Sequence, residues 1–346
     1  MARTRAQRQV YADLLERYGR AVADAFFAAI DSINRRASLA RITAAIEAGD
    51  IERALDELDI DPAAFNDMLD RIRDAQTAGG NFSTETMPRR RPDGTALTVR
   101  FDGRALGAER WMREHSSRLI SRTTEDMRQA ARQALVDSLE RGDGPRTAAL
   151  DIVGRVNRVT GRREGGILGL TSPQEEAVRR AREELASADP SGLRNYLTRT
   201  RRSRTFDRSI TKAIREGRAV DPAIADKALK AYSNRLLKLR GDTIGRVEAM
   251  SALQNGKREA FQQAIDSGKV SEADVRKAWR SASDFRVRHT HAALNGDSAR
   301  FNEPFQSPSG AMMQHPMDTS LGAGPDEIIN CRCDCEYRID FLANLR

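Results

Sequence analysis

Residues 243–267, TIGRVEAMSALQNGKREAFQQAIDS, contain the clearest helical pattern in the chain. At the α-helical advance of about 100° per residue, the apolar side chains of this stretch fall on one arc and most polar side chains on the opposite arc. The apolar arc consists of Val247, Met250, Leu253, Ala260, Phe261, Ala264 and Ile265. The opposite arc holds Glu248, Asn255, Glu259, Gln262 and Asp266. The pattern predicts an amphipathic helix.

Arg246 interrupts the apolar arc of this predicted helix. A guanidinium group on a buried face is costly unless it is paired and hydrogen-bonded. We therefore expect Arg246 to have a fixed carboxylate or carbonyl partner. The alternative is that Arg246 lies at the edge of the arc and that its long side chain reaches solvent.

Helical spacing of apolar residues continues through most of the preceding chain. Similar patterns occur in the first 75 residues and in residues 108–141, 145–159 and 221–240. The composition, with 39% hydrophobic and 5% aromatic residues, suits amphipathic helices better than large sheets. The predicted fold is therefore mainly α: an elongated multi-helix body with a small C-terminal α+β subdomain.

Glycine-rich breaks and changes of composition divide the chain into four predicted segments. They are an N-terminal helical region (1–78), a loop or extended surface arm (79–106), a central helical body (107–242) and a C-terminal domain (243–346). Gly79-Gly80-Asn81 is expected to end the first helical region. Within the C-terminal domain, Ser271 is expected to cap a short helix that reaches Trp279.

Positive charge is concentrated in one segment, residues 194–246. This segment has 15 Lys and Arg against 5 Asp and Glu, a balance of +10, whereas the whole chain carries +8. Such a block favours a polyanionic partner, nucleic acid first, although a solvated helical surface would have the same composition. The candidate DNA-binding residues are Arg199, Arg201, Arg202, Arg204, Lys227, Lys230 and Lys238.

The apolar runs of the chain are short. No run is long enough to cross a bilayer, and the N-terminus lacks the apolar core of a signal peptide. We therefore expect a soluble protein that is made in a cytoplasm and has no membrane partner.

Histidines and cysteines alternate in two short stretches near the C-terminus. If both stretches are extended, His289 and His291 share one side of a strand, and Cys331, Cys333 and Cys335 share one side of another. Together they offer up to five ligands for a structural zinc ion, which needs four. The spacing differs from the usual zinc-knuckle pattern, so buried reduced cysteines are the alternative. A disulfide between Cys331 and Cys333 would be strained.

The same region contains candidate acid–base residues. His291, Asp284 and Asn295 are the residue types that nuclease sites use. Against a catalytic reading, the sequence has no acidic cluster suited to a hard divalent ion, and no His-Glu-x-x-His or Gly-x-Ser-x-Gly pattern. A structural, hydrogen-bonding role for His291 is the favoured interpretation.

The order of several motifs in residues 243–338 resembles the phage Mu F-like head-morphogenesis family. The motifs are Arg246-Val-Glu248, then Trp279, then DFRVRHTHAALNG at residues 284–296, then Phe305, then PDEIINCRC at residues 325–333. The structural motif residues are Arg246, Glu248, Trp279, Asp284, Arg288, His291, Gly296, Asn330, Cys331 and Cys333. Val247 departs from the commoner Thr, and His289 and Cys335 are additions, so a metal site would be partly particular to this chain.

The resemblance implies a non-enzymatic bacteriophage minor head protein, present in a few copies per virion. It would lie inside the capsid near the portal vertex, after assembly in the host cytoplasm. Its implied partners are the portal protein, capsid or scaffold proteins and phage double-stranded DNA, with roles in head assembly and in DNA packaging or ejection. The alternatives are a metal-dependent nuclease acting on phage or host DNA, and a DNA-binding structural protein unconnected to the portal.

Overall fold

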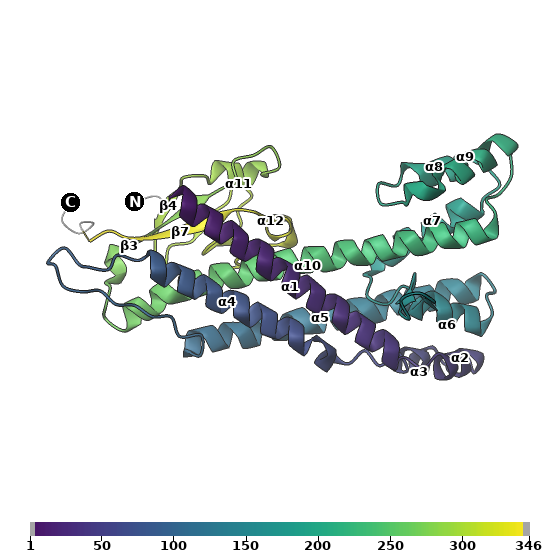
Figure 1. Ribbon diagram of the computed structural model, residues 1–346, viewed down its shortest axis with the longest axis horizontal. Coiled ribbons are helices and arrows are strands. Elements are labelled where there is room, and N and C mark those ends of the chain that lie inside the picture. Colours follow the sequence, from purple (N-terminus) through teal and green to yellow (C-terminus); the bar gives the residue numbers. More distant parts are fainter. Residues whose placement is uncertain (1–3, 342–346) are drawn as a thin grey trace. The chain divides into compact units, whose positions relative to one another are not determined.

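The computed structural model describes residues 4–341 and is mostly helical, with small antiparallel sheets (Figure 1). This confirms the prediction of a mainly α chain with a C-terminal α+β region. Two compact units are present, each built from separate stretches of sequence. The first contains residues up to Ala25, Asp67–Ser116 and the chain from Asp242 onward, and the second contains Phe26–Asn66 and Ser117–Gly241. The division into segments 1–78, 79–106, 107–242 and 243–346 stays a prediction.

Long helices supply most of the first unit. They are the N-terminal part of α1 (Arg5–Arg36), α4 (Asn66–Thr86), the start of α5 (Leu106–Glu140) and the C-terminal part of α10 (Pro222–Asp266). The helix predicted over residues 243–267 is therefore present, as the second half of α10. Its apolar arc is buried at Met250, Leu253 and Phe261.

Glycines allow α4 and α10 to touch backbone to backbone. A Cβ atom at Gly79 would lie 2.2 Å from the carbonyl oxygen of Leu253, and a Cβ atom at Gly256 would lie 1.9 Å from that of Gln76. The expected helix break at Gly79-Gly80 is wrong, because these glycines serve a helix crossing and α4 continues to Thr86.

Residues 87–105 form the irregular part of the predicted arm. Its two limbs meet at an isolated bridge between Arg90 and Ala96. Met87 and Leu97 are buried in a cluster that includes Phe261 of α10. The segment is thus shorter than predicted, since residues 79–86 are helical, and its apolar side chains are anchored in the core.

A three-stranded antiparallel sheet forms the centre of the C-terminal region. Strand β3 (Val275–Arg280) lies between β4 (Ser298–Arg300) and β7 (Asp334–Ile339), and Figure 1 shows β3 beside β7. The expected helix to Trp279 is wrong: only a 3-10 turn, η3 (Glu272–Asp274), precedes β3. Because β3 is the central strand, its side chains are mostly buried on both faces.

Short elements surround this sheet. They are α11 (His289–Ala293), α12 (Pro325–Ile328) and the hairpin of β5 (Phe305–Gln306) and β6 (Met312–Met313). Trp279 of β3 is opposite Cys335 of β7 in the sheet register. Trp279 and Phe305 pack edge to face, with ring centroids 5.4 Å apart. These elements enclose a second buried cluster that contains all three cysteines.

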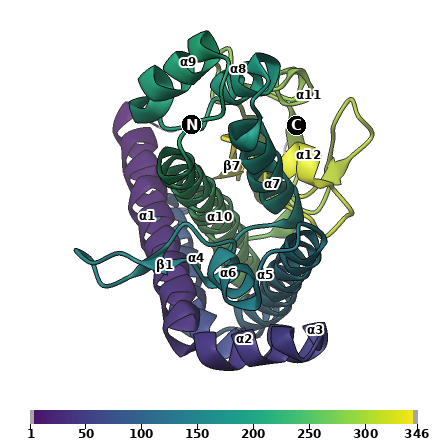
Figure 2. The same ribbon diagram turned by 90° about the vertical axis from the view of Figure 1, so that its right-hand side faces the viewer.

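The second unit is built from short helices that pack on the remaining parts of α1, α5 and α10 (Figure 2). Its own elements are α2 (Leu39–Glu47), α3 (Ile51–Asp56), η1 (Pro62–Phe65), α6 (Pro145–Val153), β1 (Arg155–Val156), β2 (Arg163–Glu164), α7 (Ser172–Ala186), α8 (Pro190–Thr198), η2 (Arg204–Phe206) and α9 (Asp207–Glu216). Helix α8 packs on both α7 and α9. None of the helices formed by residues 4–341 combines the length and apolar character needed to cross a membrane.

Candidate metal centre

A turn after α11 holds that helix against strand β3. The backbone N–H of Gly296 donates to the carbonyl oxygen of Trp279 over 2.9 Å, and the N–H of Trp279 donates to the carbonyl oxygen of Asp297 over 2.9 Å. Gly296 has φ 98°, a conformation that glycine adopts without strain. The turn therefore fixes His291, on α11, beside the Trp279 ring, with ring centroids 5.0 Å apart in an edge-to-face arrangement.

His291, Cys331 and Cys333 meet in the core of the C-terminal region. Nδ1 of His291 lies 3.4 Å from Sγ of Cys331 and 3.5 Å from Sγ of Cys333. All three side chains are buried, and their ligand atoms lie within 4.8 Å of one another. Asn330 has a left-handed backbone with φ 60°, which turns the chain so that both sulfur atoms face the imidazole.

The other imidazole nitrogen of His291 faces Glu327 of α12. Nε2 lies 2.6 Å from Oε2 of this buried carboxylate. Oε1 of Glu327 accepts hydrogen bonds from Ser307 over 3.1 Å and from Ser309 over 2.6 Å. Burial raises the pKa of Glu327, but the hydrogen bonds from Ser309 and Ser307 and the nearby His291 outweigh it, so the pKa is lowered. Glu327 therefore contacts the ring nitrogen that faces away from the two sulfur atoms, and Nδ1 is the nitrogen that faces them.

The two facing cysteines differ in acidity. A hydrogen bond from the Cys331 thiol lowers the pKa of Cys333 to about 5, with a further contribution from His291. The same hydrogen bond, together with burial, raises the pKa of Cys331. The backbone N–H of Cys333 also donates to Sγ of Cys331 over 3.4 Å. The geometry of the pair therefore favours negative charge on Cys333 over negative charge on Cys331.

Two of the five predicted metal ligands lie outside this cluster. His289 is exposed, because residues 289–293 form a helix, in which side chains two positions apart point in different directions. Cys335 is fully buried on β7, and burial raises the pKa of its thiol to about 11. The prediction assumed that both stretches were extended. Because α11 is helical, its two histidines point in different directions, and only His291, Cys331 and Cys333 lie together.

Two arginines hold the loop that carries the cysteines. Arg288 donates to the carbonyl oxygen of Glu327 and, over 2.6 Å, to that of Ile329. Arg332 forms a two-pronged ion pair with Asp284, with N–O distances of 2.6 and 2.5 Å. This ion pair holds the pKa of Asp284 well below its usual range. Four predicted positions in this region thus have defined bonding roles around the loop: Asp284, Arg288, Cys331 and Cys333.

Two cavities adjoin the cluster. A small cavity of about 20 Å³ is lined by His291, Cys331 and Cys333 together with Asn330 and neighbouring backbone and arginine side chains. A larger pocket of about 210 Å³ is lined by Arg246, Val247, Arg286, Asn330, Cys331 and Arg332. Several arginines therefore line both cavities.

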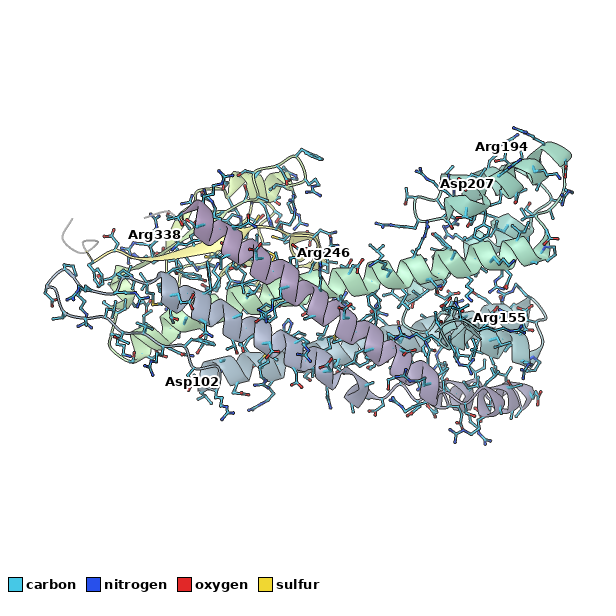
Figure 3. All side chains as sticks on the ribbon, in the orientation of Figure 1. Asp102, Arg155, Arg194, Asp207, Arg246 and Arg338 are labelled. Carbon is cyan, nitrogen blue, oxygen red and sulfur yellow. The ribbon has the colours of Figure 1, made fainter. Side chains whose placement is uncertain are left out.

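Arg246 has no buried partner. Its side chain is exposed on α10 and forms no ion pair within residues 4–341 (Figure 3). The expected carboxylate or carbonyl partner is thus absent from the described chain. The alternative, a guanidinium reaching solvent from the edge of the apolar arc, is the one the structure has.

Glu248, which was placed on the polar arc of α10, is buried. Its carboxylate meets Nε2 of His115 on α5, and the His115 ring stacks on Trp111 with centroids 4.4 Å apart. Spacing along the chain does not predict this pair, because His115 and Glu248 are 133 residues apart and only the packing of α5 on α10 joins them. Glu327 was equally missed as a functional residue, although it stands inside the quoted PDEIINCRC motif.

Three candidate residues of the basic segment have acidic partners: Arg199, Arg202 and Lys230. Arg199 forms a two-pronged ion pair with Glu184, at 2.6 and 2.9 Å, and Arg202 pairs with Asp207, at 2.9 Å for both contacts. Lys230 lies 3.5 Å from Glu164. The other candidates, Arg201, Arg204, Lys227 and Lys238, are exposed.

Further arginines on α8 and α9 extend the exposed group. Arg194, Arg208 and Arg215 are exposed, and Figure 3 labels Arg194 on α8 and Asp207 at the start of α9. Within residues 4–341, Arg201, Arg204 and Arg208 form no ion pair with an acidic side chain. We call Arg194, Arg201, Arg204, Arg208 and Arg215 the α8–α9 basic surface.

Residues 204–336 match the model of the family described as Phage Mu protein F like protein. The matched range contains every residue of the His291, Cys331, Cys333 and Glu327 cluster. No curated protein and no solved structure matches the chain.

Proposed function

Because residues 204–336 carry a phage Mu protein F-like segment, which indicates a phage head morphogenesis protein, we propose that the chain is a minor head protein inside the capsid near the portal. In this role it contacts the portal protein and capsid or scaffold proteins during head assembly in the host cytoplasm. We further propose that it contacts phage DNA and acts in packaging or ejection.

The observation that carries this proposal is the family match. The bonding of the motif residues supports a structural role. Glu327 binds His291 on its far nitrogen, while Arg288 and Arg332 hold the cysteine loop. Within residues 4–341, no carboxylate lines the small cavity beside the cluster, and both ring nitrogens of its histidine, His291, already face Glu327 and the two cysteines. We therefore propose that the chain is not an enzyme.

The α8–α9 basic surface supports contact with DNA. Guanidinium groups bind phosphate oxygens in two-pronged geometry, and neutralising phosphates releases counterions. Arg199 and Arg202 are left out of the proposed surface, because Glu184 and Asp207 already occupy their guanidinium groups. Arg201, Arg204 and Arg208 carry no such internal partner in the described chain and are exposed.

Co-purification with the portal ring tests the proposal most simply. The untagged chain is co-expressed with the tagged portal protein of the same phage, and the ring is isolated by affinity and then by size. We expect the chain to elute with the ring. A chain that elutes entirely apart from the ring would contradict the portal assignment and favour a DNA-binding protein that acts elsewhere in the head.

The alternative of a metal-dependent nuclease is favoured by one observation, the His291, Cys331 and Cys333 cluster beside a cavity. The test is plasmid cleavage with added Mg²⁺ or Zn²⁺. Cleavage that is lost in His291→Ala and kept in His289→Ala would favour the nuclease. No cleavage by the folded wild-type chain would support the structural role.

A further inference from the structure

We propose that His291, Cys331 and Cys333 bind one zinc ion, through Nδ1 of the imidazole and the two sulfur atoms. Tetrahedral zinc with Zn–N of about 2.05 Å and Zn–S of about 2.3 Å separates nitrogen from sulfur by about 3.6 Å. The observed separations of 3.4 and 3.5 Å match this value within about 0.2 Å. The two nitrogen–sulfur separations are therefore those that a zinc ion held by these atoms requires.

The chemistry of the three donors selects the metal. Two thiolates and one imidazole are the soft and borderline donors that zinc prefers, whereas magnesium and calcium take oxygen donors. Two thiolates also neutralise the double charge of the ion, which permits its burial beside Arg288 and Arg332. All three donors are buried, so the site is closed to exchange with bulk solvent except through the small cavity.

The surroundings of the donors are those of a formed metal site. Glu327 orients the imidazole through Nε2, and Ser307 and Ser309 in turn orient Glu327. A carboxylate on the far nitrogen of a ligating histidine fixes the tautomer and raises the basicity of the ligand. The N–H of Cys333 donates to Sγ of Cys331, a contact that stabilises negative charge on that sulfur.

The fourth ligand is a water molecule in the small cavity. A cavity of about 20 Å³ exceeds the roughly 10–15 Å³ that one water needs. Cys335 cannot supply the fourth ligand, since it faces the core from β7, and His289 is exposed on the other side of α11. The ion thus joins α11 to the loop between α12 and β7, which no disulfide does, because all three cysteines are free thiols.

Metal analysis of the full chain, expressed without a tag and purified without chelator, tests the site. We expect about one zinc per chain, since His291, Cys331 and Cys333 form a single site. Cys331→Ser, Cys333→Ser and His291→Ala should each lose the metal. The matched controls Cys335→Ser and His289→Ala should keep it. Circular dichroism verifies that each variant keeps the helices.

Two results would overturn the proposal. One is less than about half an equivalent of zinc in the wild-type chain, since a structural site of this type is filled in the cell. The other is loss of zinc in Cys335→Ser to the same degree as in Cys331→Ser. If the ligand variants fail to fold, cobalt(II) exchanged into the wild-type chain decides. Intense visible absorption with a thiolate charge-transfer band supports the site, and the weak spectrum of six-coordinate cobalt contradicts it.

Discussion

Glu327 and His291 form a buried carboxylate–imidazole pair, with Oε2 lying 2.6 Å from Nε2 and the two side chains 3% and 1% exposed. The pair joins α12 to α11 and directs Nδ1 of His291 at two sulfur atoms. Through His291, the carboxylate of Glu327 is thereby linked to the sulfur atoms of Cys331 and Cys333 in one cluster of four side chains.

Replacing Glu327 with Gln should weaken zinc binding without removing a ligand. Loss of the carboxylate lowers the basicity of His291, and changes of this kind cost about 10–100-fold in metal affinity. Competition with a zinc-binding dye measures the affinity. Asp326→Asn, an exposed change on the same helix, is the control and should leave the affinity unchanged. Equal affinities for Glu327→Gln and the wild type would argue against a role for Glu327 at the metal.

Stability should fall as pH is lowered from about 6.5 to about 4, because of His315. Burial lowers the pKa of this histidine to about 4, so the folded chain binds fewer protons than the unfolded chain in that window. The contribution of neutral His315 to the free energy of unfolding is therefore complete above about pH 6.5. It falls steadily below that pH and is gone at about pH 4. At about 1.4 kcal/mol for each unit of pKa, the full loss is about 3–4 kcal/mol.

Urea unfolding followed by circular dichroism at several pH values measures this contribution. His315→Gln should be less stable than the wild type at pH 7 and should show a shallower decline between about pH 6.5 and 4. The exposed change His289→Gln should leave the decline intact. A His315→Gln curve parallel to that of the wild type would be incompatible with a neutral buried His315.

A methyl group at Gly256 should destabilise the first unit. The new Cβ would lie 1.9 Å from the carbonyl oxygen of Gln76, so α4 and α10 must separate. Overpacking of this kind costs about 1–3 kcal/mol, and contact with backbone, which cannot rotate away, places Gly256→Ala at the upper end. Thermal unfolding gives the measurement. Gly144→Ala, where nothing lies within 4 Å of the new Cβ, should change the midpoint little.

Neutralising two arginines of the α8–α9 basic surface should reduce the salt dependence of DNA binding. Each lost phosphate contact lowers the slope of log K against log salt concentration by about 1, so Arg201→Gln with Arg204→Gln should lower it by about 2. Fluorescence anisotropy with nonspecific duplex DNA reports the slope. Arg20→Gln, an exposed arginine paired with Glu16 on α1, is the control. An unchanged slope in the double variant would remove this surface from the DNA contact.

The helices were predictable because their signal is local. The apolar arc of residues 243–267 depends only on spacing, and it is buried in α10 as expected. The helix break predicted at Gly79 and Gly80 was wrong because that prediction, too, used only local sequence. A glycine pair weakens a helix locally, and only the partner helix, α10, shows why it is there.

The candidate site was predictable in composition but not in geometry. His291, Cys331 and Cys333 were all singled out from the sequence, whereas the exclusion of His289 and Cys335 depends on whether each short stretch is helical or extended. Glu327 acts through His291 across the fold, and spacing along the chain contains no trace of that contact. The buried partner predicted for Arg246 is absent from the described residues, because helical spacing does not show where the apolar arc ends and solvent begins.

Quantitative mass spectrometry of purified phage particles measures whether the chain is a minor component of the phage head. Particles of the phage that encodes this chain are purified, emptied of DNA and separated into heads and tails. We expect the chain in the head fraction, in a few copies for each portal ring. Absence from purified heads, with the chain abundant in the infected-cell lysate, would contradict it.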